Sequence, residues 1–486
     1  MKKLSVLEPK ELWMYFEDIC AIPRPSKKEE QIRNHIIEFA KKFKLDYQVD
    51  KAGNLLIKKG ATKGMEKCKT IVLQSHLDMV GEKNSDTLHD FEKDSLKVFI
   101  EGDWVKAKGT TLGADDGIGV AAQMAVLASD NIAHGSIECL FTVDEETGLS
   151  GAFALEKGFF EGKTLLNLDS EDEGELFIGC AGGNDTVAIF KYKLKNAPEK
   201  CLAFEISVKG LKGGHSGDDI HKGLGNSNKI ITRFLWNISN DFGARLAHFD
   251  GGNLRNAIAR EARAIFTIAP EHYEGCKAYF DNYVILVGSE LKTTEPSLIM
   301  QLLHADPPLN VINKKAQSRL LDCLYACPHG VIEWSREMPG LVETSTNLAS
   351  IKFISDSEIQ VTTSQRSSVD SARKDISDQV QNIFTMGKAS VSHSTGYPGW
   401  KPNQNSEILK ISKESYKELF GNEPIVRAIH AGLECGLFLE KFPELDMVSF
   451  GPTIRGAHSP DERLSIESTS KFWKLLLSVL EKTPKK

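Results

Sequence analysis

The 486-residue sequence has no run of five or more lysines and arginines, and no uninterrupted apolar stretch approaching 18 residues. The first absence, with a formal net charge of −7, argues against a nucleic-acid-binding face. The second means that we expect no transmembrane helix. Two N-terminal lysines are not followed by the apolar segment of a secretory signal. We therefore expect a soluble cytoplasmic protein without nucleic-acid or membrane partners.

Several sequence patterns that would define other protein classes are also missing. The nine cysteines are an odd number and include no CxxC pair, which disfavours a disulfide framework and a cysteine-type zinc knuckle. There is no HExxH segment, which excludes the thermolysin type of zinc site. The apolar fraction of 41% and the charged fraction of 26% are ordinary globular values. The length predicts about two or three domains.

Helical and strand-like patterns alternate over the first 180 residues. Helices are expected from Pro9 onward, over residues 28–43 and over residues 117–129. Strands are expected at residues 54–59, 69–75, 137–143 and 165–169. This alternation predicts an α/β fold whose mixed central sheet carries helices on both faces.

A second domain interrupts this pattern. The glycine-rich segment 179–184 precedes strands with period-two alternation, and helices follow at about 223–238 and 371–384. We expect an inserted α+β lid domain over residues 185–388, built from two related strand–helix halves. Residues 1–184 and 389–486 would then form one catalytic domain. A groove between two such domains is a common ligand site.

In five segments of the predicted catalytic domain, acidic or histidine side chains lie at or just beyond the carboxyl end of an apolar strand. These segments are residues 74–78 (QSHLD), 113–119 (GADDGIG), 143–148 (VDEETG), 166–171 (LNLDSE) and 456–461 (GAHSPD). Taken one at a time, each is more typical of a solvated strand end, a helix N-cap or an exposed loop. Ligands bind at the carboxyl edge of open α/β sheets, so we expect the five segments to meet there.

Together these segments favour a metal centre. His76, Asp115, Glu146, Asp169 and His458 would offer two nitrogens and three carboxylates, a set that suits zinc, manganese or cobalt better than magnesium or calcium. A carboxylate shared by two ions would let five ligands serve both. The glycine loop at 113–119 lacks a GxGxxG pattern, and its two aspartates would repel a phosphate.

Seven segments resemble a known enzyme family. They are LQSHLDMV, KGTTLGADDGIGVA, FTVDEETGLSGA, NLDSEDEGELFIGCAGG, LKGGHSGDDIHKGLGN, IHAGLECGLF and GPTIRGAHSPDE. They resemble the aminoacyl-histidine dipeptidases, the carnosinase-like cytosolic Xaa-His dipeptidases of the aminoacylase/carboxypeptidase-G zinc metallopeptidase superfamily. The likeness runs from about Pro9 to Trp473.

The resemblance implies a two-zinc site, with manganese or cobalt as other candidates. One ion would be held by His76, Asp115 and Asp169, and the other by Asp115, Glu146 and His458. Asp78 would orient His76, and Glu145 would be the general base. A cis peptide between Asp115 and Asp116 is also implied, although relatives often carry asparagine in place of Asp116.

The resemblance also implies roles in the inserted domain. His215 would donate a hydrogen bond to the oxyanion as the domains close. Asn256 and Arg366 would contact the substrate carboxylate, and Gly432 would offer a backbone N–H to the substrate. The hypothesis is hydrolysis of unblocked dipeptides, Xaa-His preferred, by water that Glu145 deprotonates.

Alternatives remain open at this stage. An N-acyl-amino-acid deacylase or carboxypeptidase could use the same scaffold. A different class of function, a non-catalytic peptide-binding protein, is the other alternative. The sequence leaves open the metal used, the preferred residue before histidine, and whether the protein is a monomer or a homodimer.

Overall fold

The computed structural model describes residues 4–485 and divides into two compact units. Unit 1 contains the described residues up to 179, residues 400–428 and the residues from 433 onward, and unit 2 contains residues 180–399 and 429–432. These limits differ from the expected 184/185 and 388/389. The difference arises because the first strand of unit 2 already begins at Gly182, where the N–H of Gly183 bonds to the carbonyl of Tyr397.

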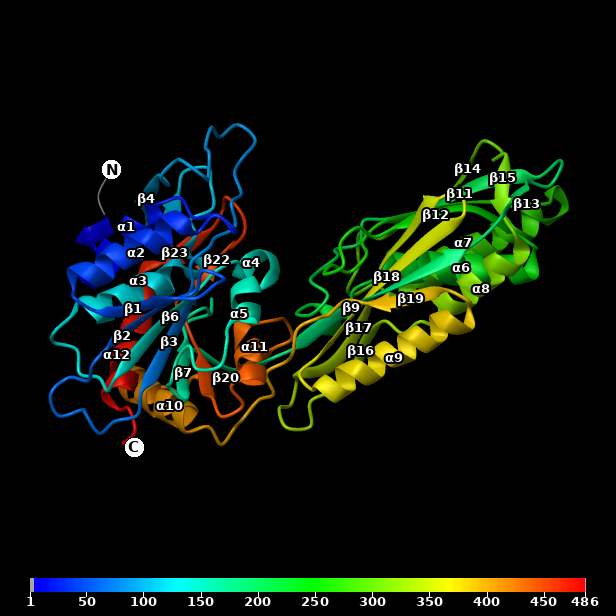
Figure 1. Ribbon diagram of the computed structural model, residues 1–486. Coiled ribbons are helices and arrows are strands. Elements are labelled where there is room, and N and C mark those ends of the chain that lie inside the picture. Colours follow the sequence, from blue (N-terminus) through cyan, green and yellow to red (C-terminus); the bar gives the residue numbers. More distant parts are fainter. Residues whose placement is uncertain (1–3, 486) are drawn as a thin grey trace. The chain divides into compact units, whose positions relative to one another are not determined.

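Unit 1 is built on an eight-stranded mixed sheet of order β1-β2-β6-β3-β7-β21-β8-β20 (Figure 1). Its strands are β1 (Asp46–Val49), β2 (Leu55–Lys59), β3 (Ile71–His76), β6 (Ile137–Thr142), β7 (Thr164–Asn167), β8 (Glu175–Cys180), β20 (Ile425–Ile429) and β21 (Asp446–Ser449). A small sheet adds β4 (Val98–Glu101), β5 (Trp104–Ala107), β22 (Ile454–Arg455) and β23 (Arg463–Ser465).

The helices of unit 1 come from both ends of the chain. They are α1 (Lys10–Cys20), α2 (Glu30–Lys42), α3 (Ala114–Ala128), α4 (Glu145–Gly148), α5 (Ser150–Ala154), α10 (Glu407–Phe420), α11 (Glu434–Lys441) and α12 (Ile466–Glu481), with a short 3-10 helix at Leu4–Val6. The expected mixed α/β class is confirmed. Among residues 4–485, no helix combines the length and apolar character that a membrane crossing requires.

The centre of the unit 1 sheet is parallel and buried on both faces. Strand β3 lies between β6 and β7 and is parallel to both, and every residue of β3 and β6 is buried. Such continuous burial requires cover on each side of the sheet. Helix α3, rich in alanine and valine, packs against β3 and α1. The carboxyl ends of β3, β6 and β7 therefore share one edge.

Unit 2 contains a nine-stranded antiparallel sheet formed by two halves of the same topology (Figure 1). The first half is β11 (Leu202–Lys209), α6 (Ser227–Asp241), β12 (Arg245–Gly251), β13 (Ala262–Ile268), α7 (Tyr273–Glu290) and β14 (Ile299–His304). The second is β9 (Gly182–Lys191), α8 (Lys314–Ala326), β17 (Val342–Ser355), β18 (Glu358–Ser367), α9 (Asp370–Met386) and β19 (Ser390–His393), and β16 (Gly330–Trp334) pairs with β17. Each half is a βαββαβ unit.

The first half is inserted into the second, in the connection between β9 and α8. Strands β10 (Leu194–Asn196) and β15 (Asn310–Ile312) pair antiparallel where the chain enters and leaves the insertion. The two halves meet through β12 and β17, which pair at Gly251 and Ile351. One apolar cluster extends under the whole sheet and includes Phe234, Phe266 and Phe384.

We predict that Gly252→Ala destabilises unit 2 at this junction. Gly252 has φ +63°, and an added Cβ would lie 1.9 Å from the carbonyl oxygen of Ala349. The left-handed conformation alone costs an L-residue about 1–2 kcal/mol, so the midpoint of urea unfolding should fall. Gly288→Ala is the matched control, because Gly288 lies in a helix with open space around it and alanine should stabilise it by about 0.5–1 kcal/mol. Equal stability of the Gly252→Ala variant and the wild type would contradict this prediction.

Candidate metal centre

The predicted ligands of unit 1 gather at the carboxyl edge of the parallel strands. His76 is the last residue of β3 and pairs in register with Thr142, the last residue of β6. The chain then turns into α4, which begins with Glu145 and Glu146. Asp169 follows β7 by two residues.

Asp115 faces a histidine with each of its carboxylate oxygens. Its Oδ1 lies 3.0 Å from His76 Nε2, and its Oδ2 lies 3.2 Å from His458 Nε2. His458 reaches the site from the opposite end of the chain, on a loop where its φ is +62°. A carboxylate placed in this way can be shared by two ions.

Two further carboxylates complete the cluster. Asp169 Oδ1 lies 3.4 Å from His76 Nε2, and Glu146 Oε2 lies 3.0 Å from His458 Nε2. Three groups of side chains could each hold one ion: His76 with Asp115 and Asp169, Asp115 with Glu146 and His458, and His76 with Glu145 and Glu146. The structure thus brings all five predicted ligands together, and it places Glu145 beside them.

The electrostatics of the cluster reflect crowded negative charge. Burial raises the pKa of the Asp169 carboxyl to about 7, and burial with the charges of Asp169 and Glu146 raises the pKa of Glu145 well above its usual range. Hydrogen bonds to Asp115 and Glu146 raise the pKa of His458 to about 11. Divalent cations bound in this cluster would offset the same charge.

A second observation, an unpartnered buried oxygen, also supports a metal centre. Glu146 Oε1 is buried and has no hydrogen-bond partner among the described residues. A buried carboxylate oxygen without a donor is costly unless a cation lies beside it. The set of two imidazoles and three carboxylates suits zinc, manganese or cobalt.

Asp78 lies beneath the cluster and holds the segment that bears Glu145. Its Oδ1 accepts the backbone N–H of Glu145 at 3.0 Å and lies 3.4 Å from His76 Nδ1, while its Oδ2 accepts the N–H of Glu146 at 3.3 Å. Burial would raise the pKa of Asp78, but the contacts with His76 and these N–H groups lower it to about 2. Asp78 is thus a carboxylate in contact with both His76 and the first turn of α4.

Glu462, which sequence reasoning did not single out, holds the loop before Asp115. Its carboxylate accepts the backbone N–H groups of Leu112, Gly113 and Ala114 at 2.7, 2.9 and 2.7 Å, and it is 2% exposed. Gly113 supplies the left-handed φ of +65° that turns these N–H groups inward. The Asp115–Asp116 peptide that follows is cis, as the resemblance implies.

Glu434 is a second buried carboxylate that sequence reasoning missed. Its Oε2 accepts Gln74 Nε2 and Thr142 Oγ1, each at 2.7 Å, and burial raises its pKa to about 8. Gln74 accepts in turn from Asn167 Nδ2 at 2.5 Å. Gln74 and Asn167 lie two residues before His76 and Asp169, so this polar network crosses the sheet next to the metal-binding cluster.

The predicted residues of unit 2 also lie close to one another. Arg366 Nη2 lies 3.4 Å from His215 Nε2, and Arg366 Nη1 donates to Tyr397 Oη at 3.0 Å. The carbonyl of Asn256 accepts the N–H next to His215, that of Ser216, at 2.8 Å. Gly432 packs on the Tyr397 ring, where an added Cβ would lie 2.7 Å from a ring carbon.

Two residues of this second cluster were not predicted. Tyr397 joins Arg366 to Gly432, and His430 contacts Ser345 Oγ through Nε2 at 2.8 Å. Burial lowers the pKa of His430 to about 3, with the Arg366 charge adding to the effect. The only sequence signal for His430 was its place in the segment IHAGLECGLF.

The chain is similar to several known proteins. The family model described as "Peptidase family M20/M25/M40" matches residues 72–482. The cytosol non-specific dipeptidase of Escherichia coli (strain K12) is 43% identical over 486 residues, all of both chains. The crystal structure of aminoacylhistidine dipeptidase from Vibrio alginolyticus is 44% identical, with a TM-score of 0.93, over 100% of this chain and 99% of the other. An aminopeptidase from Bacillus cereus, at 17% identity and a TM-score of 0.59 over 98% and 99% of the chains, shares the fold.

We predict that Glu462→Gln weakens metal binding. The amide nitrogen would face the backbone N–H groups of the loop before Asp115, so the loop should shift. Loss of a residue that supports a ligand typically costs 10–100-fold in metal affinity. Zinc affinity measured against a competing chelator checks this, with the exposed neighbour Asp461→Asn as control. Unchanged affinity in a folded Glu462→Gln variant would show that the loop does not depend on this carboxylate.

Proposed function

Because this chain belongs to peptidase family M20/M25/M40, we propose that it is a metal-dependent dipeptidase that hydrolyses unblocked dipeptides, with a preference for the Xaa-His type. The observation that carries this proposal is the Asp115 carboxylate between His76 and His458, with Glu145 beside them. Two relatives named as dipeptidases, one of them an aminoacylhistidine dipeptidase, support the substrate class. The name of the cytosol relative supports a cytosolic location.

The proposed reaction uses two divalent ions. Zinc is the first candidate, and manganese and cobalt are the alternatives. His76, Asp115 and Asp169 would hold one ion, and Asp115, Glu146 and His458 the other. Two of the three groups found among the side chains match this division. When bound, the ions would polarise the scissile carbonyl and lower the pKa of the attacking water.

Glu145 is the general base of the proposed reaction. It takes a proton from the attacking water and passes it to the leaving amine. Its support is its position, because its backbone N–H is fixed by Asp78 and its carboxylate lies within the metal-binding cluster. Asp78 acts indirectly, by holding the His76 imidazole in orientation.

His215 donates a hydrogen bond from Nε2 to the oxyanion in this proposal. The backbone N–H of Asp218 donates to His215 Nδ1 at 3.2 Å, which leaves the ring proton of a neutral imidazole on Nε2. Arg366 Nη2 is also a donor and lies 3.4 Å from Nε2, near the limit for a hydrogen bond.

The substrate carboxylate is assigned to Arg366 and Asn256. Arg366 can offer paired donors, and its Nε is buried without a partner among the described residues. Gly432 would contribute a backbone N–H to the substrate. Support for a shared role comes from the contacts within unit 2: Arg366 lies beside His215, the Asn256 carbonyl accepts the N–H of Ser216, and Gly432 packs on the Tyr397 ring whose hydroxyl Arg366 contacts.

We predict that Glu145→Ala retains its metal and loses turnover. Removal of a general base typically costs at least about 10²-fold, whereas His76, Asp115, Glu146, Asp169 and His458 all remain. Metal content is measured by elemental analysis and kcat on an Xaa-His dipeptide. Glu156→Ala, an exposed glutamate of the same unit, is the control. Near-normal turnover in Glu145→Ala would reject its assignment as the base.

We also predict a requirement for a free α-amine and a short chain. Unblocked dipeptides should be cleaved with zinc or manganese added, and N-acetylated dipeptides, tripeptides and tetrapeptides should be poor substrates. A kcat/KM panel over these compounds checks this. A preference for N-acyl substrates would instead indicate a deacylase or carboxypeptidase, and binding without any turnover would indicate a peptide-binding protein.

A further inference from the structure

The segment Arg24–Glu29, just before α2, contacts three of the loops that bear predicted site residues. Arg24 is 1% exposed and donates through Nη1 to the carbonyls of Leu77 at 3.0 Å and Asp78 at 2.8 Å. Its Nη2 donates to the carbonyl of Gly113. One buried guanidinium therefore joins the loop after β3 to the loop before Asp115.

Ser26 and Glu29 extend these contacts toward α4. Ser26 Oγ donates to Asp78 Oδ2 at 2.8 Å, on the carboxylate that holds the N–H groups of Glu145 and Glu146. Glu29 Oε1 accepts the N–H of Lys27 at 2.8 Å and the N–H of Asp144 at 3.0 Å. Consecutive N–H groups at 144, 145 and 146 are thus bound by two carboxylates.

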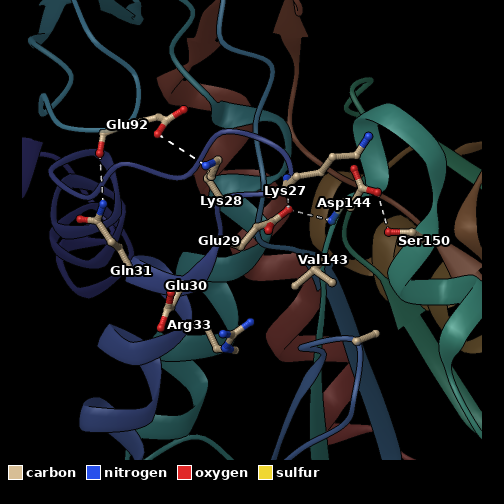
Figure 2. A pocket seen from close by; sticks show the side chains of 11 residues that line it. Lys27, Lys28, Glu29, Glu30, Gln31, Arg33, Glu92, Val143, Asp144 and Ser150 are labelled. Carbon is tan, nitrogen blue, oxygen red and sulfur yellow. Dashed lines mark hydrogen bonds and ion pairs between the residues drawn. The ribbon is translucent and has the colours of Figure 1, made fainter.

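The turn at Asp144 needs such support. Asp144 adopts φ 53° and ψ 46°, a left-handed conformation that is unfavourable for a residue with a side chain. Its own carboxylate is occupied by Ser150 Oγ at 2.5 Å and by Thr147 Oγ1. Figure 2 shows Glu29 reaching the Asp144 N–H from one side, while Ser150 contacts the Asp144 carboxylate from the other.

Glu29 is placed to act on the turn. It is 6% exposed and lines a cavity of about 480 Å³ together with Lys27, Arg33 and Asp144 (Figure 2). Beyond the turn, Thr147 and Ser150 are exposed to solvent. Loss of the Glu29 contact would therefore leave the Asp144 N–H without its acceptor beside this cavity.

We propose that Glu29 is a positioning residue for the general base: it fixes the Asp144 turn from which Glu145 projects into the metal cluster. This inference rests on the proposed function, because it assumes that Glu145 takes the proton. Glu29 itself touches neither ligand nor base and acts through the backbone N–H of Asp144. A displacement of about 1 Å at a reacting group can cost about 10²-fold in rate.

Three substitutions separate the acceptor oxygen from the volume and charge of the side chain. Glu29→Gln keeps an oxygen that can accept both N–H groups and should keep kcat within about threefold. Glu29→Met keeps the volume without an acceptor and should lower kcat by at least about tenfold with KM and metal content little changed. Glu29→Asp keeps the charge but withdraws the oxygen by about 1.5 Å. It should lower kcat as the Met variant does, and it takes the place of the Met variant if that variant fails to fold. Glu30→Ala, the exposed neighbour, is the control and should equal the wild type.

A double variant tests whether Glu29 acts through Glu145. Glu29→Met placed in the Glu145→Ala background should lower kcat no further, because the base it positions is already gone. A further drop, wild-type kcat in both the Met and Asp variants, or equal losses in Gln and Met would overturn the inference. Full activity of Glu145→Ala alone would reject the proposed function instead, so the two failures are distinguishable.

Discussion

The Glu462 carboxylate, bound by the backbone N–H groups of the loop before Asp115, is the interaction on which the metal centre depends most. Glu462 lies four residues after His458, so this contact joins the loop that bears His458 to the loop that bears Asp115, and those two side chains meet in the cluster. Several N–H groups that donate to one carboxylate hold a loop more firmly than a single hydrogen bond does.

The same chemistry recurs around the site. Asp78 binds the N–H groups at the start of α4, Glu29 binds the turn before it, and Glu295 in unit 2 binds the N–H groups of Lys212 and Gly225 at the two ends of the His215 loop. Each carboxylate satisfies donors that would otherwise be orphaned in a loop. Backbone N–H groups thus place the reactive side chains, and the side chains remain available for ions and substrate.

Much of the fold and of the candidate site could be predicted because the signals were local. Periodicity and composition predict the strand that leads to His76 and the small-residue helix after Asp116, and the structure forms both. Glu145 and Glu146, expected at a strand end, instead open the short helix α4. Glu29, Glu434 and Glu462 could not be predicted in this way. Their hydrogen-bond partners are backbone N–H groups 115 and about 350 positions away for Glu29 and Glu462, and a side-chain amide 360 positions away for Glu434. The sequence around an isolated glutamate does not indicate such a distant partner.

The expected boundary at 184/185 rested on the glycine-rich segment 179–184. In the structure Gly182 already opens β9, whose pairing partners in β18 lie 167 to 185 positions further along the chain. The two related halves of the inserted domain were anticipated only as strand–helix repeats. Their nested order is a property of strand pairing that no short sequence window contains.

The pairing of β10 with β15 gives the inserted half a narrow neck. Because the chain enters and leaves it at adjacent positions, Leu194 and Ile312, the ends of the intervening segment are held together by one pair of strands. His215 lies within that segment, whereas Arg366, beside it, lies on β18 outside the segment. The two side chains can therefore meet only when both halves have folded onto one another.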